Sequence, residues 1–278
     1  MTVGCMVWRI GGIVDFYEQI EWLRGHGFEA VSFWTCGGVE GEWEGFDGLR
    51  AGESEVRRLR EALREFARVD LHAAATPTDA GGVTELERTL DFAGEIGADV
   101  VTMHDGRMPG ESEESVAERM RRVLPVLNRR AAKANVRVGL ELTDNYALAL
   151  RPDCERVGFT LDTGHVSMDG GAGYRGFGSI AGLIQHVGER LFCVHVHDYD
   201  GRFDHLAIGA GCVDFASVVE ALRRVRYDGV LCLEPNPERV SPEEILESRE
   251  RLRAALSKSG DTEHCVPGGR RDARRTRL

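Results

Sequence analysis

The residues best suited to chemistry lie in the stretch Phe159–His165, which reads F-T-L-D-T-G-H. An apolar run ends there in Asp162, and His165 follows three residues later. A short buried strand followed by a tight turn would place both side chains on the same rim. Other apolar runs end in the same way, at Glu141, at His195 and at Glu234. Carboxylate and imidazole groups at the ends of successive strands are what a divalent metal site needs.

These residues need a scaffold in which short strands alternate with helices. The expected strands are Val3–Trp8, Phe28–Trp34, Val69–Ala75, Asp99–His104, Val138–Glu141, Val157–Asp162, Leu191–His197 and Val230–Glu234. The expected helices between and after them are Asp15–His26, Glu53–Ala67, Val83–Gly97, Ser112–Asn135 with a kink at Pro125, Ile180–Val187, Phe215–Arg224 and Pro242–Leu256. Eight strand–helix units close into a single (β/α)8 TIM barrel. A doubly wound open sheet is the alternative, but no G-x-G-x-x-G follows the first strand.

Length and composition set the domain boundaries. The chain has 278 residues, of which 42% are hydrophobic, enough for one large core. We assign residues 1–257 to the barrel. Residues 258–278 carry many arginines and few apolar side chains, which predicts a disordered basic tail. The segments Thr35–Gly52 and Asp169–Gly178 are rich in glycine and predict loops.

Charge and hydropathy exclude several classes of partner. A net charge of −11 argues against nucleic-acid binding, which needs clustered Lys and Arg. With no long apolar run and no basic leader followed by an apolar segment, we expect neither a membrane span nor a secretory signal. The seven scattered cysteines predict reduced thiols in a cytoplasmic protein. The only lysines, Lys133 and Lys258, follow no strand-like run, which disfavours Schiff-base chemistry.

In a barrel, side chains at the carboxyl ends of the strands point toward one mouth. We therefore predict a metal site made of Glu141, Asp162, His195 and Glu234, although any one of the acids alone could form a rim salt bridge. Three carboxylates and one imidazole suit Mn²⁺, Mg²⁺ or Co²⁺ better than a structural zinc. Further histidines at strand ends or in the loops after them are His72, His104, His165, His197 and His205.

The motifs Leu161–His165, His195–Asp198, His205–Gly211 and Leu233–Pro235 resemble those of the xylose-isomerase-like TIM-barrel superfamily. This group contains sugar isomerases and epimerases, hydroxypyruvate isomerase, inosose dehydratase and endonuclease IV. The match covers the second half of the chain in order, and the first half only through His72 and His104. The spacing of 21 residues from Glu141 to Asp162 is short for the superfamily. The fifth helix is therefore expected to be a remnant, Tyr146–Leu150, which could leave an apolar face for a homo-oligomer.

The resemblance implies that Glu141, Asp162, His195 and Glu234 bind one divalent metal, with Mn²⁺ preferred and Mg²⁺, Co²⁺ or Zn²⁺ as alternatives. It also implies that Glu141 and Glu234 transfer a proton on a small sugar, keto-sugar or polyol through an enediolate, giving isomerisation or epimerisation. His165 would hydrogen-bond a substrate oxygen during catalysis. The expected substrate-binding residues are His72, His104, His197, His205, Arg202 and Trp34.

Three alternatives stay open. A dehydratase of a keto-polyol would begin with the same proton abstraction. An endonuclease IV-like phosphodiesterase would hold three zinc ions, and eight of its nine ligand positions are matched here. The ninth position is Phe203, and the neighbouring Asp204 is expected to point elsewhere. A barrel that binds a ligand without catalysis is the third.

Aromatic residues of the second loop, Trp43 and Phe46 among them, would either stack on a sugar or pack the loop against the barrel.

Overall fold

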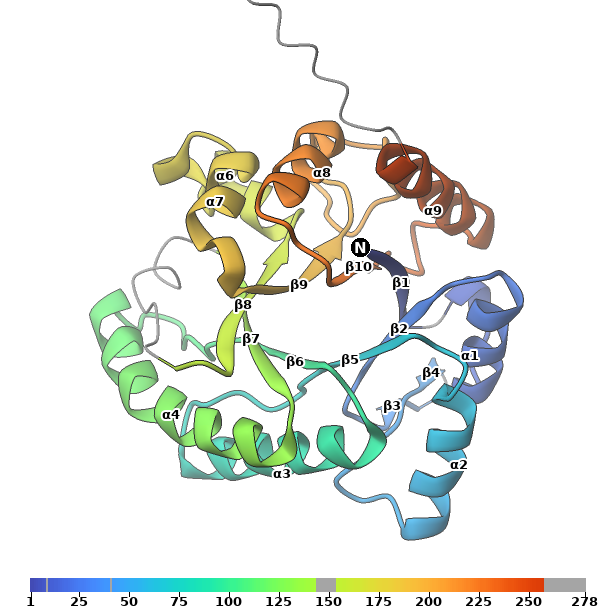
Figure 1. Cartoon of the computed structure of the whole chain (residues 1–278), viewed down its shortest axis with the longest axis vertical. Helices are drawn as coiled ribbons and strands as arrows, with labels where there is room; N and C mark the ends of the chain where they lie inside the picture. The colour runs from blue at the N-terminus through green and yellow to red at the C-terminus, as the bar shows by residue number, and fades with distance from the viewer. Residues whose placement is uncertain (9, 41, 144–153, 258–278) are drawn as a thin grey trace, which may run out of the picture.

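Eight parallel strands form a closed barrel (Figure 1). The computed structural model describes residues 1–257 apart from 9, 41 and 144–153. In chain order the barrel strands are β1 (Thr2–Val7), β2 (Ala30–Trp34), β5 (Arg68–His72), β6 (Val100–Met103), β7 (Arg137–Leu142), β8 (Val157–Asp162), β9 (Leu191–Val196) and β10 (Val230–Leu233). Strand β1 pairs in parallel with both β2 and β10, and these pairings close the sheet. The predicted TIM barrel is confirmed.

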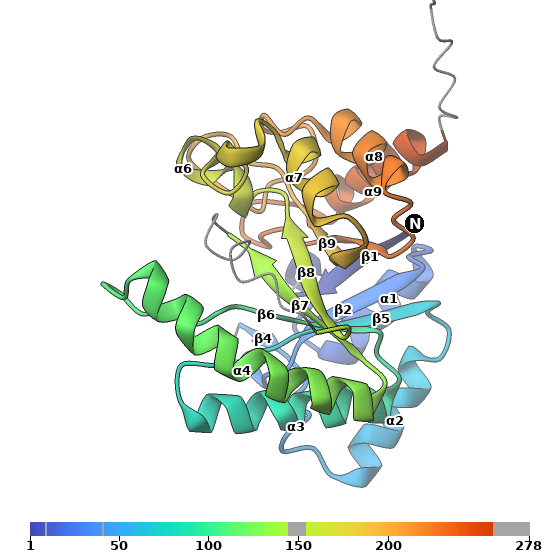
Figure 2. The ribbon, with the colours of Figure 1, turned by 60° about the vertical axis from the view of Figure 1, so that its left-hand side comes forward.

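Helices surround the barrel on the outside (Figures 1 and 2). They include α1 (Phe16–Gly25), α2 (Glu53–Leu63), α3 (Ala80–Ile96), α4 (Glu113–Ala134), α7 (Ile180–Val187), α8 (Phe215–Arg224) and α9 (Pro242–Ser257). The predicted cap of α1 is confirmed, since Glu18 N donates to Asp15 Oδ1 at 2.8 Å. The predicted helix remnant Tyr146–Leu150 and the tail 258–278 lie outside the described residues.

Some boundaries differ from the predictions. Helix α3 begins three residues early, because the carboxylate of Asp79 accepts a hydrogen bond from Gly82 N at 2.9 Å. Helix α4 continues as one α-helix on both sides of Pro125. Both predicted loops contain short elements. The loop 35–52 holds an antiparallel pair of strands, β3 (Gly38–Val39) and β4 (Trp43–Glu44). The loop 169–178 overlaps α6 (Met168–Gly171) and contains the 3-10 helix η3 (Arg175–Phe177).

The core has an outer and an inner part. Outward-facing strand side chains such as Val31, Leu71 and Leu161 belong to the large apolar cluster shared with the helices. A smaller cluster of Met6, Ala30, Val230 and Cys232 is separate from it, with Trp8 and Trp34 packed against it. Among the described residues, no helix is both long and apolar enough to cross a membrane.

The strand register places the predicted site residues at one end of the barrel. Strand β8 ends at Asp162, whose Cα partner on β9 is His195. On the other side of β9, His195 pairs with Cys232 of β10, so that Glu234 lies just beyond the paired residues. Because parallel strands all point the same way, their carboxyl ends meet at one mouth.

Candidate metal centre

The four predicted metal ligands meet around one atom. His195 Nδ1 lies 2.9 Å from Glu234 Oε2, 3.7 Å from Glu141 Oε2 and 4.0 Å from Asp162 Oδ2. All four side chains are at most 3% exposed. The structure therefore brings three carboxylates and one imidazole from four neighbouring strands to a single buried point.

The charges at this point are strongly coupled. Burial acts to raise the pKa of Glu234, but the positive charge of His195 close by outweighs it and lowers the pKa to about 2. Burial acts to lower the pKa of His195, and Glu234 reverses this and raises it to about 9. The pKa values of Glu141 and Asp162 also lie below their usual range, despite burial, because of nearby histidines. In the absence of another cation, protonated histidines balance the carboxylates.

A divalent cation fits this donor set. His195 Nδ1 is buried and makes no hydrogen bond, although three carboxylates surround it. A buried nitrogen without a hydrogen-bond partner is costly, and a cation shared with the carboxylates would remove that cost. Three carboxylate oxygens and one imidazole nitrogen are suitable ligands for Mn²⁺, Co²⁺ or Zn²⁺.

Glu141 also faces two predicted substrate-binding histidines. Its Oε2 lies 3.0 Å from His72 Nε2 and 3.9 Å from His104 Nε2. His72 is buried, whereas the His104 side chain is 35% exposed and therefore reachable from the mouth. The ring of Trp34 stacks on that of His72, with centroids 3.7 Å apart. His72, His104 and Glu141 form another group whose atoms are close enough to hold a metal ion.

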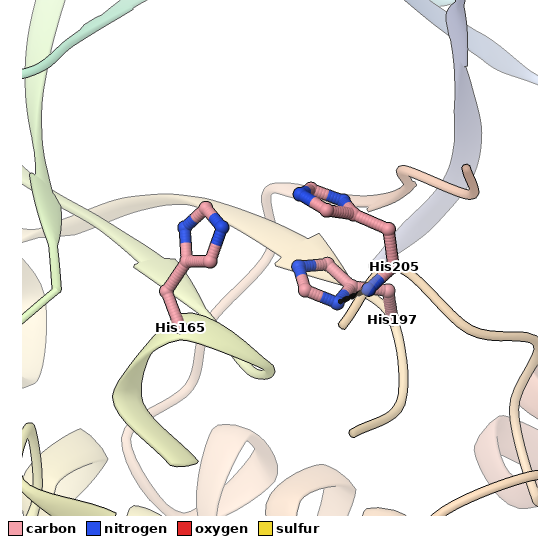
Figure 3. Close-up of side chains that lie close together, drawn as sticks. All are labelled: His165, His197 and His205. Atoms are coloured by element: carbon pink, nitrogen blue, oxygen red, sulfur yellow. Dashed lines mark hydrogen bonds between the residues drawn. The ribbon is translucent and has the colours of Figure 1, made fainter. Parts of the chain in front are cut away.

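A second group of histidines lies beside the first point. Figure 3 shows His165 facing His197 and His205, and the ligand atoms of the three lie within 4.8 Å of one another. His165 Nδ1 contacts Glu141 Oε1 at 2.8 Å, which joins this group to the four-residue point. The ring of Trp8, which sequence reasoning missed, meets the edge of His205 at 5.6 Å between centroids.

Asp204 corrects a prediction. Its side chain was expected to point away, yet Asp204 Oδ2 lies 3.6 Å from His165 Nε2 and 3.9 Å from His205 Nε2. The contact with His165 is the main reason that the pKa of Asp204 falls to about 2. Burial works to lower the pKa of His165, but the charge of Asp162 and close contacts with the carboxylates of Asp204 and Glu141 raise it to about 12. His205, with φ of 52°, turns the chain at this point, a feature that the residue spacing did not reveal.

Two other residues named in the predictions make contacts with aromatic rings. Arg202 is exposed, and its guanidinium lies over the ring of Phe203 at 4.6 Å. Phe46 is buried against Phe16, Phe33 and Phe92. Of the two predicted roles, stacking on a sugar or packing the second loop against the barrel, the structure shows the packing role for Phe46.

The fold and the site define a TIM barrel whose mouth gathers carboxylates and histidines at the strand ends. A family model for the xylose isomerase-like TIM barrel matches residues 20–255, and the chain belongs to this family. Among curated proteins, the chain is 29% identical over 161 residues to an uncharacterised protein of Methanocaldococcus jannaschii. The matched region spans about half of each chain, 52% of this one and 53% of the relative.

Solved structures share the fold at low sequence identity. A D-tagatose 3-epimerase-like protein superimposes with a TM-score of 0.73 at 21% identity, over 92% of this chain and 97% of that one. The 3-keto-D-glucoside 4-epimerase of E. coli gives 0.69 at 17% identity, over 91% and 99%. The IOLI protein with a bound zinc atom gives 0.70 at 17% identity, over 93% and 99%.

Proposed function

We propose that this protein is a divalent-metal-dependent isomerase or epimerase acting on a small sugar, keto-sugar or polyol. The observation that carries the proposal is the buried point where Glu141, Asp162 and Glu234 surround His195 Nδ1. Family membership and similarity to structures described as sugar epimerases support it.

The chain's own residues suit a proton transfer. Glu141 and Glu234 lie on opposite sides of His195 along the barrel wall, and the lowered pKa values keep both in the ionised form that a general base needs. When bound, a divalent metal would polarise a substrate carbonyl and make the adjacent C–H more acidic. One glutamate would take that proton, and the other would return it to a different carbon or face. His165, 21% exposed, would hydrogen-bond a substrate oxygen, and Trp34 and Trp8 would line the mouth.

The test is proton exchange in D₂O. Protein loaded with Mn²⁺, Co²⁺ or Zn²⁺ is incubated with ketohexoses, ketopentoses and keto-inositols, and NMR follows deuterium uptake and product formation. Exchange together with an isomer or epimer supports the proposal, whereas exchange with loss of a hydroxyl identifies the keto-polyol dehydratase instead. A protein that holds metal but exchanges no proton on any of these substrates would overturn it.

An endonuclease IV-like phosphodiesterase is the second candidate. The observation in its favour is that His72, His104 and Glu141 form one possible metal group, and that Asp204 joins His165 and His205. Metal analysis separates the two candidates, because the phosphodiesterase needs about three zinc ions per chain and would nick DNA at abasic sites. One ion per chain and intact abasic DNA would eliminate it.

A further inference from the structure

Three consecutive residues of the D-T-G-H stretch all contact His197. The carboxylate of Asp162 lies 2.8 to 2.9 Å from His197 Nε2. Thr163 Oγ donates to the carbonyl of His197 at 2.7 Å and accepts from its backbone N–H at 3.1 Å. A Cβ on Gly164 would lie 2.1 Å from His197 Cε1, so only glycine leaves room for the ring there. The turn after β8 is shaped around this imidazole.

The hydrogen bonds assign the tautomer of His197. The backbone N–H of His205 donates to His197 Nδ1 at 2.8 Å, drawn as a dashed line in Figure 3. A backbone amide can only donate, so Nδ1 accepts and the ring proton sits on Nε2, directed at Asp162. The carbonyl of Asp198, 3.4 Å from Nδ1, would need the opposite tautomer, and the shorter contact to the obligatory donor decides between them.

This arrangement leaves His197 no nitrogen for a metal or a substrate. Both ring nitrogens have protein partners, and the side chain is fully buried. Proximity to His165 and His205, or to Asp162 and Glu234, therefore does not by itself make His197 a ligand.

His197 also fixes the turn that follows β9. His205 adopts φ of 52°, which is unfavourable for a residue with a Cβ, and its N–H is held by His197. The His205 ring stacks on that of His197 at 4.0 Å, and His205 Nδ1 donates to the backbone carbonyl of Glu234 at 2.8 Å. The stacked pair of His197 and His205 thus joins Asp162 at the end of β8 to Glu234 at the end of β10.

We propose that His197 is a positioning residue of the metal centre: as the Nε2–H tautomer it orients the carboxylate of Asp162, and through Nδ1 it holds the turn at His205. The inference rests on the metal centre of the proposed function, but not on the identity of the substrate. Groups that orient metal ligands typically change metal affinity by about 10- to 100-fold when removed.

Two substitutions separate the two hydrogen bonds. His197→Gln places an amide N–H near the position of Nε2 and keeps the donor to Asp162. His197→Asn places an amide oxygen near Nδ1, which keeps the acceptor for His205 but loses the donor to Asp162. Metal affinity is measured by competition with a chromogenic chelator, using Mn²⁺, Co²⁺ and Zn²⁺ separately. We expect His197→Asn to weaken binding by about 10- to 100-fold and His197→Gln to stay close to the parent.

The control is His186→Asn, an exposed histidine on α7 that should leave affinity unchanged. Adding His197→Asn to Asp162→Asn should weaken binding no further, because His197 acts through Asp162. Parent-like affinity in folded His197→Asn, or equal losses in both His197 variants, would overturn the proposal.

Long-range ¹H–¹⁵N NMR of the parent protein tests the tautomer directly and does not depend on whether the variants fold. A His197 resonance with the proton on Nδ1 would overturn the proposal, whereas an Nε2–H resonance supports it. If the parent binds no divalent metal, the metal centre fails, and with it the metal-positioning role of His197. If it binds metal but turns over no sugar, only the proposed reaction fails.

Discussion

At the scale of single residues, the carboxylates of the proposed metal centre are held to different extents. Asp162 accepts hydrogen bonds from His197 Nε2 and from the backbone N–H of His165 at 2.7 Å, so its orientation is fixed from two sides. Glu234 faces His195 Nδ1 at 2.9 Å without a hydrogen bond. Asp162 is therefore suited to act as a ligand alone, whereas Glu234 is free to act as a ligand and also to move a proton.

We therefore predict different defects for Glu234→Gln and Asp162→Asn. Glu234→Gln keeps one ligand oxygen but removes the base, so turnover should fall by about 10²- to 10⁴-fold with metal still bound. Asp162→Asn should act mainly through weaker metal binding, so that excess Mn²⁺ restores part of the rate. Proton exchange is followed while metal is titrated into each variant. Full rescue of Glu234→Gln by metal would show that Glu234 is a ligand only.

Asp70 is a second buried acid, inside the barrel and outside the metal centre. It is 1% exposed, its Oδ1 has no hydrogen-bond partner, and Cys193 Sγ lies 3.5 Å from its Oδ2. Burial is the main cause that raises the pKa of this carboxyl to about 7.

The raised pKa makes the contribution of Asp70 depend on pH. Because the folded protein holds the proton up to about pH 7 and the unfolded chain releases it near pH 4, stability should fall between these values and level off above pH 7. Asp70→Asn lacks this loss, so its stability relative to the parent should increase by up to about 4 kcal/mol across the window. Urea unfolding at several pH values measures the difference, with exposed Asp91→Asn as control. A difference that is independent of pH would contradict the assignment.

At the scale of elements, α4 contains a proline in its interior, which destabilises a helix. Pro125 is exposed in the middle of this helix of 22 residues and cannot donate a backbone hydrogen bond. Buried residues on both sides of it, Val116, Met120, Leu124 and Leu127 among them, hold the helix on the barrel. Tertiary packing therefore keeps the helix continuous where local preference would interrupt it.

Pro125→Ala should stabilise the protein. Alanine is about 3 kcal/mol more favourable than proline inside a helix. Removing proline also makes the unfolded chain more flexible, which destabilises the folded protein by about 1 kcal/mol. We expect the free energy of unfolding to rise by about 2 kcal/mol, measured by urea denaturation. The neighbouring exposed Arg122→Ala, which loses a surface ion pair with Glu118, should change it by less than about 0.5 kcal/mol. An unchanged or lower stability of Pro125→Ala would show that proline suits the local geometry.

At the scale of the whole molecule, we predict that metal binding at the buried carboxylates stabilises the folded protein. A ligand that binds only the folded protein stabilises it by about 2.7 kcal/mol at 100 times its Kd. For a protein of this size that corresponds to a rise in Tm of roughly 5–10 °C. Calorimetry with and without Mn²⁺, Co²⁺ or Zn²⁺, and after chelation, measures the shift. Asp162→Asn should need a higher metal concentration for the same shift, and an unchanged Tm at saturating metal would argue against a metal centre.

Local sequence patterns determine the barrel fold, the start of α1 and the end of the barrel at which the polar side chains gather. Strand–helix alternation predicts the closed barrel, and Asp15 marks the start of α1 because a cap is a contact between near neighbours in the chain. The carboxylates and the imidazole that follow apolar runs were expected to meet, and they do, since the direction of parallel strands brings their ends together.

The tertiary structure decided the partners of each side chain. The direction of Asp204 depends on the left-handed turn at His205, and the role of His197 depends on Gly164 and on an amide eight residues further along the chain. The polar surroundings of Asp70 arise across the barrel, where Cys193 is 123 residues away. Such contacts are set by strand register and loop conformation, which spacing along the sequence does not specify.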